Sequence, residues 1–189
     1  MPWEKSFNRN GVLSKAMMVF WRRGYDNTAI GDLVKETGAS RYGLYDEFDD
    51  KAGLFLEALD QYRDTVVKPR LGKLLQKGAT RDDLAEYFQK LAAPPKKSFQ
   101  GLGCMMCDTA VSVAHQNPAA AQKVTEHMAL LHRAFLGALT DSHSKPEQTA
   151  INQAHFLVGL VQGGAVLSRS GASDDVKSVY YTIGLTALN

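Results

Sequence analysis

Two cysteines three positions apart are the first residues whose types and spacing could support chemistry. Cys104 and Cys107 lie in the segment GLGCMMCDTAV, and on a helix this spacing places both thiols on one face. A thiol near a helix N-terminus has a lowered pKa and reacts as a thiolate, so Cys104 could sense oxidants or electrophiles. The alternative is that both are small buried hydrophobic side chains, the common location of a free cysteine.

Little else in the sequence suggests catalysis. Zinc would need a second ligand pair, and His115, His127 and His132 share no tight ligand spacing with the cysteines. We find no GxSxG motif, P-loop or dinucleotide fingerprint. A redox enzyme of the thioredoxin type would place its CxxC after a strand, and no strand is legible. We therefore expect no enzyme, no metal and no cofactor, with a thiol-dependent redox enzyme or sensor as the alternative.

The segment GDLVKETGASRYGLYDEF, from Gly31 to Phe48, suggests a different chemistry. Two short helices joined by a turn after Gly38 form a helix-turn-helix, which presents the outer face of its second helix to a major groove. Arg41 could pair with guanine in bidentate fashion, whereas hydroxyl, ammonium and helix-start N–H groups suit phosphate oxygens. The candidate DNA contacts are Thr28, Ser40, Arg41, Tyr42, Gly43, Tyr45 and Lys51. On geometry alone, an ordinary helical hairpin explains the segment equally well.

The elements that must position these residues are helical, because apolar residues recur with a helical period almost throughout and no strand alternation is sustained. We expect a first helix ending before Gly24, a second capped by Thr28 that stops at Gly38, and a third capped by Ser40. A longer helix then closes near Pro69. The fold class is all-α, with a compact three-helix domain at residues 1–50.

The remaining helices should form a larger bundle, residues 51–189. A capping box at Thr80 opens one helix, and residues 92–99 read as an exposed linker. Further helices are expected over 102–116, from Asn117, and from Pro146 to about residue 169. Ser173 opens the last one, which brings the total to about nine helices.

Composition and charge narrow the class only slightly. The chain has 189 residues and a net charge of +2, and residues 1–50 carry seven Lys/Arg against eight Asp/Glu. The overall charge of this region therefore does not indicate nucleic-acid binding. The longest apolar run, 154–167, is too short to cross a bilayer, and residues 1–10 lack a signal-peptide stretch. We expect a cytoplasmic protein without a membrane partner.

Residues 6–62, and above all FWRRGYDNTAIGDLVKETGASRYGLYDEFDDKAGLF, resemble the N-terminal region of the tetracycline-repressor (TetR) family of transcriptional regulators. The matching pattern consists of Gly24, Tyr25, Thr28, Leu44, Tyr45, Phe48 and Lys51. The second half is similar more loosely, through GLGCMMCDTAV and GLVQGGAVLSRSGAS. The resemblance implies a DNA-binding regulator, most often a repressor, that is controlled by a small ligand or reactive compound.

Three residues depart from that pattern. Many relatives carry a small residue where Tyr42 stands, and polar, neutral or basic residues where Asp46 and Glu47 stand. Glu47 could accept a hydrogen bond from cytosine or could pair with Arg41 or a neighbouring cation, and we favour the pairing. With so few cations, Lys15, Arg22, Arg23 and Lys35 would supply the long-range attraction.

A single helix-turn-helix buries little DNA surface, so a homodimer on a palindromic double-stranded operator is expected. The last two helices are the predicted seam, as the resemblance also implies through a four-helix bundle. Gly159, Gly163 and Gly164 should let backbones approach there. The interface candidates are Phe156, Gly159, Leu160, Val161, Gly163, Val179, Tyr180 and Ile183.

A small-molecule effector of unknown identity should bind between facing helices of the bundle. The candidates are Tyr62, Phe88, Cys104, Met105, Met106, Met128, His132 and Phe135. Each of these side chains is, taken singly, more often core than pocket.

Overall fold

The computed structural model describes residues 8–140 and 147–186, and within them every regular element is helical. The helices are α1 (Arg9–Arg23), α2 (Ile30–Thr37), α3 (Arg41–Phe48), α4 (Lys51–Tyr62), α5 (Lys68–Leu71), α6 (Arg81–Ala92), α7 (Met105–Ser112), α8 (Pro118–Leu139), α9 (Gln148–Arg169) and α10 (Asp174–Thr186). A π-helical stretch, Arg63–Val67, joins α4 to α5 into one rod. With that rod counted once, the described ranges hold nine helices, and the all-α prediction is confirmed.

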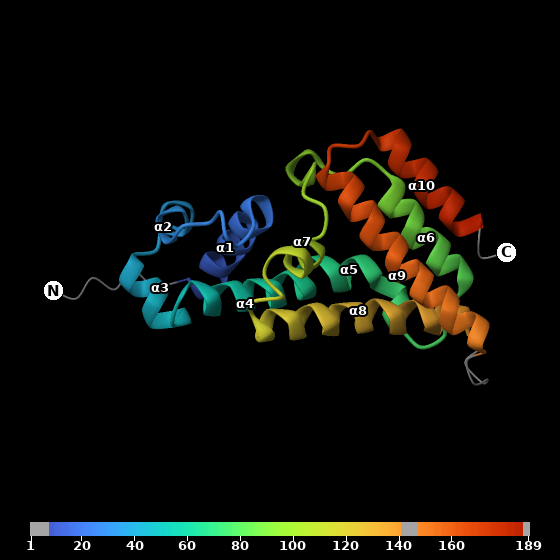
Figure 1. Ribbon diagram of the computed structural model, residues 1–189, viewed down its shortest axis with the longest axis horizontal. Coiled ribbons are helices and arrows are strands. Elements are labelled where there is room, and N and C mark those ends of the chain that lie inside the picture. Colours follow the sequence, from blue (N-terminus) through green and yellow to red (C-terminus); the bar gives the residue numbers. More distant parts are fainter. Residues whose placement is uncertain (1–7, 141–146, 187–189) are drawn as a thin grey trace.

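The molecule is elongated (Figure 1). Helices α1, α2 and α3 sit at one end beside the start of the α4–α5 rod, and α6, α9 and α10 gather at the other. Helix α8 runs along the rod, and α7 lies between α1 and α9. The rod therefore connects the helix-turn-helix to the bundle without a flexible linker.

Most helix ends follow from local sequence. Ser40 accepts the N–H of Gly43 at the start of α3, and Asp50 accepts that of Gly53 at the start of α4. The capping box at Thr80 forms with Asp83 as predicted. Gly38 ends α2 in the left-handed region at a φ of 76°, which a side chain would disfavour.

Two of the predicted helix boundaries differ from the structure. Ala29, not Thr28, precedes α2, and its N–H is accepted by the Asp32 carboxylate. The helix expected over 102–116 spans only Met105–Ser112. The α4–α5 rod ends at Leu71, two residues after Pro69 and so near it, as predicted. Helix α9 begins at Gln148, and the expected start at Pro146 lies outside the described residues.

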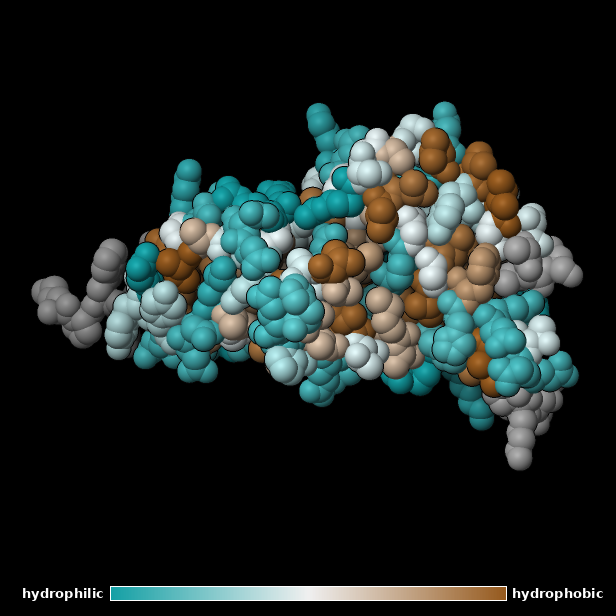
Figure 2. All heavy atoms as spheres, viewed as in Figure 1, coloured by the Kyte–Doolittle hydropathy of each residue, from teal (hydrophilic) through white to brown (hydrophobic). Residues whose placement is uncertain are grey.

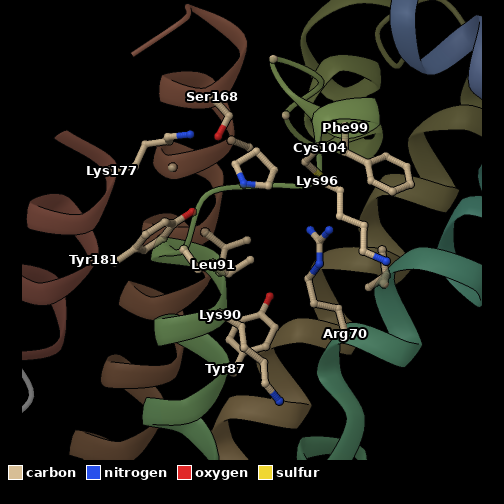
Figure 3. Close-up of a pocket in the computed structure, with 18 of the residues that line it drawn as sticks. Arg70, Tyr87, Lys90, Leu91, Lys96, Phe99, Cys104, Ser168, Lys177 and Tyr181 are labelled. Carbon is tan, nitrogen blue, oxygen red and sulfur yellow. The ribbon is translucent and has the colours of Figure 1, made fainter. Parts of the chain in front are cut away.

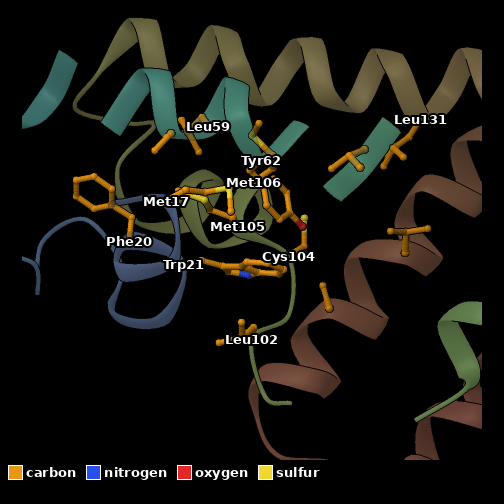
Figure 4. Packing of buried hydrophobic residues seen from close by; sticks show 14 of the residues in the cluster. Met17, Phe20, Trp21, Leu59, Tyr62, Leu102, Cys104, Met105, Met106 and Leu131 are labelled. Atoms are coloured by element: carbon orange, nitrogen blue, oxygen red, sulfur yellow. The ribbon is translucent and has the colours of Figure 1, made fainter. Parts of the chain in front are cut away.

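The hydrophobic core runs continuously from the helix-turn-helix into the bundle (Figure 4). Phe20 packs edge-on against Phe55, and the neighbouring Trp21 packs edge-on against Tyr62 with ring centroids 4.8 Å apart. Helix α4 thus shares its core with α1 at one end and with the bundle at the other. The division of the chain at residue 50 stays a prediction, since that residue caps the helix that belongs to both parts.

By length and composition, α9 could cross a membrane. In the structure it packs against α7, α8 and α10, and Leu157 and Ala154 are fully buried in the core.

Candidate nucleic-acid interface and ligand cavity

The opening turn of α3, Ser40–Gly43, faces outward. Leu44 and Phe48 are 1% and 2% exposed and anchor the helix, so the alternate face is free. Arg41 is exposed and Tyr42 is 79% exposed, as the sequence predicted. Tyr45 is 41% exposed on the flank. The turn can enter a groove, and the individual base contacts stay predictions.

Short-range hydrogen bonds hold α2 and α3 at a fixed angle. The Thr37 hydroxyl donates to the Leu33 carbonyl at 2.6 Å and accepts the Ala39 N–H at 3.2 Å. Lys15, on α1, donates to the Thr37 carbonyl at 3.3 Å. The helix-turn-helix is thus fixed by bonds between its own residues.

Two of the predicted phosphate contacts do not fit the structure. Thr28 is completely buried, and its hydroxyl donates to the Gly24 carbonyl at 2.6 Å, so that side chain cannot reach DNA. The Lys51 ammonium donates to the carbonyls of Tyr25 and Thr28, both at 3.1 Å, and lies 4.1 Å from the Tyr25 ring centroid. Lys51 therefore ties α4 to the loop before α2 instead of standing free.

The acidic residues of α3 are partly neutralised. Glu47 pairs with Arg9, which also bonds both carboxylate oxygens of Glu57 at 2.7 and 2.8 Å. The preference for an ion pair at Glu47 is confirmed, although the partner is Arg9 and not Arg41. The Arg9 guanidinium also lies 5.0 Å from the centroid of the Phe48 ring.

Few cations remain free at this end of the molecule. Arg23 pairs with Asp32 at 2.5 Å. Arg22, Lys35 and Arg41 are exposed, and across the described ranges none of them forms an ion pair. These three are the cations that phosphates can attract without breaking a contact.

Behind α1 lies a cavity of about 290 Å³, lined by residues of α1, the α4–α5 rod, α6, α8, α9, α10 and the loop before α7 (Figure 3). We call it the central cavity. Of the predicted ligand residues, Tyr62 and Cys104 line it. The others are not part of its lining: Phe88, Met105, Met106 and Phe135 lie in the packed core, and Met128 and His132 lie on α8 outside the cavity.

Sequence reasoning missed most of the lining, including Trp21, Arg70, Tyr87, Lys96, Lys177 and Tyr181. Among these residues, Lys177 was the most recognisable from the sequence, because it is a charged residue in an apolar helical stripe. It is only 7% exposed, and its ammonium pairs with Asp174 at 2.6 Å. The other residues come from five separate segments, so no local pattern could have gathered them.

Of the two interpretations of the cysteines, the structure favours the unreactive one. Cys104 directly precedes α7 but is 8% exposed, and burial raises the pKa of its thiol. Burial, with Cys104 and Asp108 nearby, raises the pKa of Cys107 to about 11. The Cys104 Sγ lies 3.9 Å from Nε2 of His127, whose pKa burial lowers to about 4. A neutral imidazole beside a protonated thiol does not activate it, so the redox alternative is not favoured.

The predicted seam residues divide into a set with large exposed side chains and a set that packs within the chain. Phe156, Val179 and Ile183 are 46%, 57% and 63% exposed, and we call their surface the α9–α10 face. Hydrophobic side chains gather there in the upper right of Figure 2. Gly159 also lies on it, with open space where a Cβ would stand.

The other predicted seam residues also pack within the chain, although Leu160 and Tyr180 line the hollow on the α9–α10 face, and their place between subunits stays a prediction. Leu160 and Val161 are 5% and 9% exposed. A Cβ on Gly163 would collide with the Tyr180 hydroxyl, and one on Gly164 with that of Tyr181. These glycines let α9 and α10 of one chain approach each other.

One arginine connects the bundle to the helix-turn-helix. Arg169, at the end of α9, donates from Nη1 to the carbonyls of Trp21 at 3.0 Å and Leu102 at 3.3 Å, and pairs with Asp108 at 3.5 Å. The indole of the same Trp21 lines the central cavity. The last turn of α1 is therefore in contact with both the cavity and the end of α9.

Known proteins share both the pattern and the shape. A family model described as "Bacterial regulatory proteins, tetR family" matches residues 12–58. The chain is 30% identical over 174 residues to the HTH-type transcriptional repressor ComR of Escherichia coli K12, covering 89% of this chain and 83% of ComR. It is 25% identical over 147 residues to the uncharacterized HTH-type transcriptional regulator YezE of Bacillus subtilis 168, covering 78% of this chain and 76% of YezE.

Among solved structures, a cysteine mutant of the TetR family regulator CifR, complexed with a 26-bp double-strand operator DNA, superposes with a TM-score of 0.83. The match covers 99% of this chain and 98% of CifR at 22% identity, which supports a common fold.

Proposed function

The chain belongs to the TetR family of bacterial regulatory proteins, and we propose that it is a cytoplasmic repressor that binds a palindromic operator as a homodimer and releases it when a small ligand fills the central cavity. ComR, to which the chain is 30% identical, is named a transcriptional repressor, and the structure of a CifR mutant is a complex with operator DNA. These relatives support DNA binding and repression as the activity of this chain.

The exposed opening turn of α3 is the observation that carries the proposal. Arg41 and Tyr42 project from a helix whose other face is locked into the core, and the Ser40 cap leaves the first turn ordered. Arg41 is the base-reading residue, because a guanidinium matches the two major-groove acceptors of guanine. Tyr45, Ser40 and the free cations Arg22 and Lys35 are placed to contact phosphates.

Pairing follows from the α9–α10 face. Several large apolar side chains are exposed there together, which is typical of a surface that a second copy of the chain covers. Phe156, Gly159, Val179 and Ile183 form the center of the proposed seam. Two heads acting together supply the affinity that one short helix lacks.

Ligand control is supported by the position of the cavity. The Trp21 ring is shared by the cavity and the core of α1, and its carbonyl is held by Arg169 from α9. A ligand that binds more tightly to one spacing of the two α3 helices shifts the dimer toward that spacing. When that spacing misses the two half-sites, the operator is released.

The test starts from genomic fragments captured by the purified protein, whose shared sequence defines the operator. Fluorescence anisotropy of a labelled operator duplex should show saturable, salt-sensitive binding of two chains per palindrome. A matched duplex with one half-site scrambled should bind far more weakly. Equal binding to intact and half-scrambled duplexes would overturn the proposed paired reading of a palindrome.

A further inference from the structure

The lining of the central cavity includes a hydrogen-bond donor without a partner. The Trp21 side chain is 1% exposed, and its indole Nε1 finds no hydrogen-bond acceptor in residues 8–140 and 147–186. Tyr87 and Tyr181, on helices α6 and α10, also line the cavity. A buried donor without an acceptor costs free energy, which a ligand acceptor would recover.

The charge of the lining is one-sided. Its cations are Arg70, Lys90, Lys96 and Lys177, and none of the described residues around the cavity is Asp or Glu. Lys90 is neutralised by Glu86 and Lys177 by Asp174, each at 2.6 Å. Arg70 and Lys96 form no ion pair with any residue in the described ranges. The cavity therefore carries uncompensated positive charge.

Arg70 points that charge inward. Figure 3 shows its side chain rising from the rod toward the middle of the cavity, between Tyr87 and Cys104. Burial raises the pKa of Tyr62 and Tyr87 well above its usual range, while the charge of Arg70 lowers the pKa of both. Burial likewise raises the pKa of Tyr181 to about 12 against the same opposing charge. One guanidinium thus acts on hydroxyls from three helices.

We propose that the effector is an amphipathic organic anion, an acid whose charged group binds Arg70 and whose apolar body packs against Trp21, Tyr62 and Tyr181. Charge-assisted bonds from a guanidinium fit an acid group, and the unpartnered Trp21 indole N–H is a further donor beside the cavity. The aromatic walls fit a flat or elongated apolar body that a cavity of about 290 Å³ can hold. This inference rests on the proposed function only in treating the cavity as the effector site.

A matched pair of fluorescent probes tests the role of charge. 1-Anilinonaphthalene-8-sulfonate and N-phenyl-1-naphthylamine share an apolar skeleton, and only the first carries an acid group. The Trp3→Phe variant leaves Trp21 as the single tryptophan, so energy transfer from Trp21 to the probe reports occupation of the cavity. We expect the sulfonate to bind at least roughly tenfold more tightly than the neutral amine.

Substitution of Arg70 separates charge from packing. Arg70→Met should weaken the sulfonate by roughly tenfold or more and leave the neutral amine unchanged, and Arg70→Lys should retain part of the affinity. Arg133→Met is the control, because Arg133 is exposed on α8 outside the lining. Equal affinity for both probes, or equal losses for both in Arg70→Met, would overturn the inference.

The two proposals fail in different ways. If the sulfonate binds through Arg70 but leaves operator affinity unchanged, the ligand class stands and the proposed release mechanism is wrong. If the sulfonate does not bind in the cavity while the protein still binds its operator, the DNA-binding function stands and the ligand class is wrong.

Discussion

The α3 opening turn and the central cavity are opposite kinds of site within one chain. The turn is built from four consecutive residues, is open to solvent, and is held by a cap and by bonds that span a few positions. The cavity is assembled from six helices and a loop, is walled by aromatic rings, and has a donor that lacks an acceptor. The turn is rigid on its own, whereas the cavity is incomplete without a ligand.

This difference shows how work is divided in the molecule. A ligand can control the rigid α3 opening turn only by changing its position. The central cavity borders α1, which belongs to the same three-helix end of the chain. Trp21 and Arg169 lie at that border, one through its ring and its carbonyl, the other through two hydrogen bonds. Control is therefore expected to move the reading helices as rigid bodies and not to refold them.

The largest effect should come from breaking the proposed homodimer, on which both DNA binding and its control by a ligand depend. Ile183→Glu would place a carboxylate in an apolar seam, which costs several kcal/mol when the charge is left unpaired. We expect monomers in sedimentation and a loss of operator affinity of roughly a hundredfold or more. Val111→Glu is the control, since Val111 is 79% exposed on α7, away from the α9–α10 face. A stable dimer with unchanged operator affinity would contradict the seam.

Acid should destabilise the cavity side of the molecule. His127 is held neutral by burial, with a folded pKa of about 4 against an ordinary 6.5, so the unfolded chain binds the additional proton between these values. Stability is then complete above pH 6.5 and is lost as the pH falls, by about 2 kcal/mol between pH 7.5 and 5. Urea unfolding at both values measures it. His127→Gln should remove most of this loss, and the exposed His115→Gln should not; identical losses in the two variants would contradict the assignment.

On the reading side, Lys51 should act on stability and not on sequence preference. Lys51→Met leaves the carbonyls of Tyr25 and Thr28 without their donor, which should lower the free energy of unfolding by about 1–2 kcal/mol. Binding to operator and scrambled duplex should weaken alike. Lys35→Met, an exposed and unpaired control on α2, should stay within about 0.5 kcal/mol of the parent. Preserved stability with weakened DNA binding would restore Lys51 as a phosphate contact.

The smallest effect is expected at the thiols. Because burial raises the pKa of both cysteines, N-ethylmaleimide at pH 7 should label Cys104 and Cys107 much more slowly than a free thiol. Mass spectrometry after timed quenching follows the labelling, and 6 M urea provides the unfolded reference. Labelling of Cys104 at the unfolded rate, with loss of operator binding, would bring back a thiol sensor.

The sequence predicted what depends on neighbours along the chain. The helix-turn-helix, the Ser40 cap and the exposure of Arg41 follow from apolar period and capping residues, and each is present. The predicted Thr28 cap of α2 was wrong because the Thr28 hydroxyl donates to the Gly24 carbonyl and does not accept an N–H of the helix start, which the residue type alone could not reveal.

Burial, and contacts between residues far apart in the chain, could not be predicted from the sequence. The sequence left two interpretations of Cys104 open, because its proximity to a helix start was visible while the surrounding core, which raises the pKa of its thiol, was not. Gly163 and Gly164 were assigned to a seam between chains, yet they make room for tyrosines of α10 in the same chain. Arg70 and Lys177 line the same cavity only because the fold places α5 and α10 around it.

The direct test of the central claim is the ratio of affinities for the captured operator and a scrambled duplex, measured by anisotropy for the parent protein and for Arg41→Ala. Arg41 has no ion pair in the described residues, so its removal should leave stability unchanged. The account predicts that the ratio falls by about 1–3 kcal/mol while affinity for the scrambled duplex changes little. Equal weakening on both duplexes would contradict base reading by the α3 opening turn.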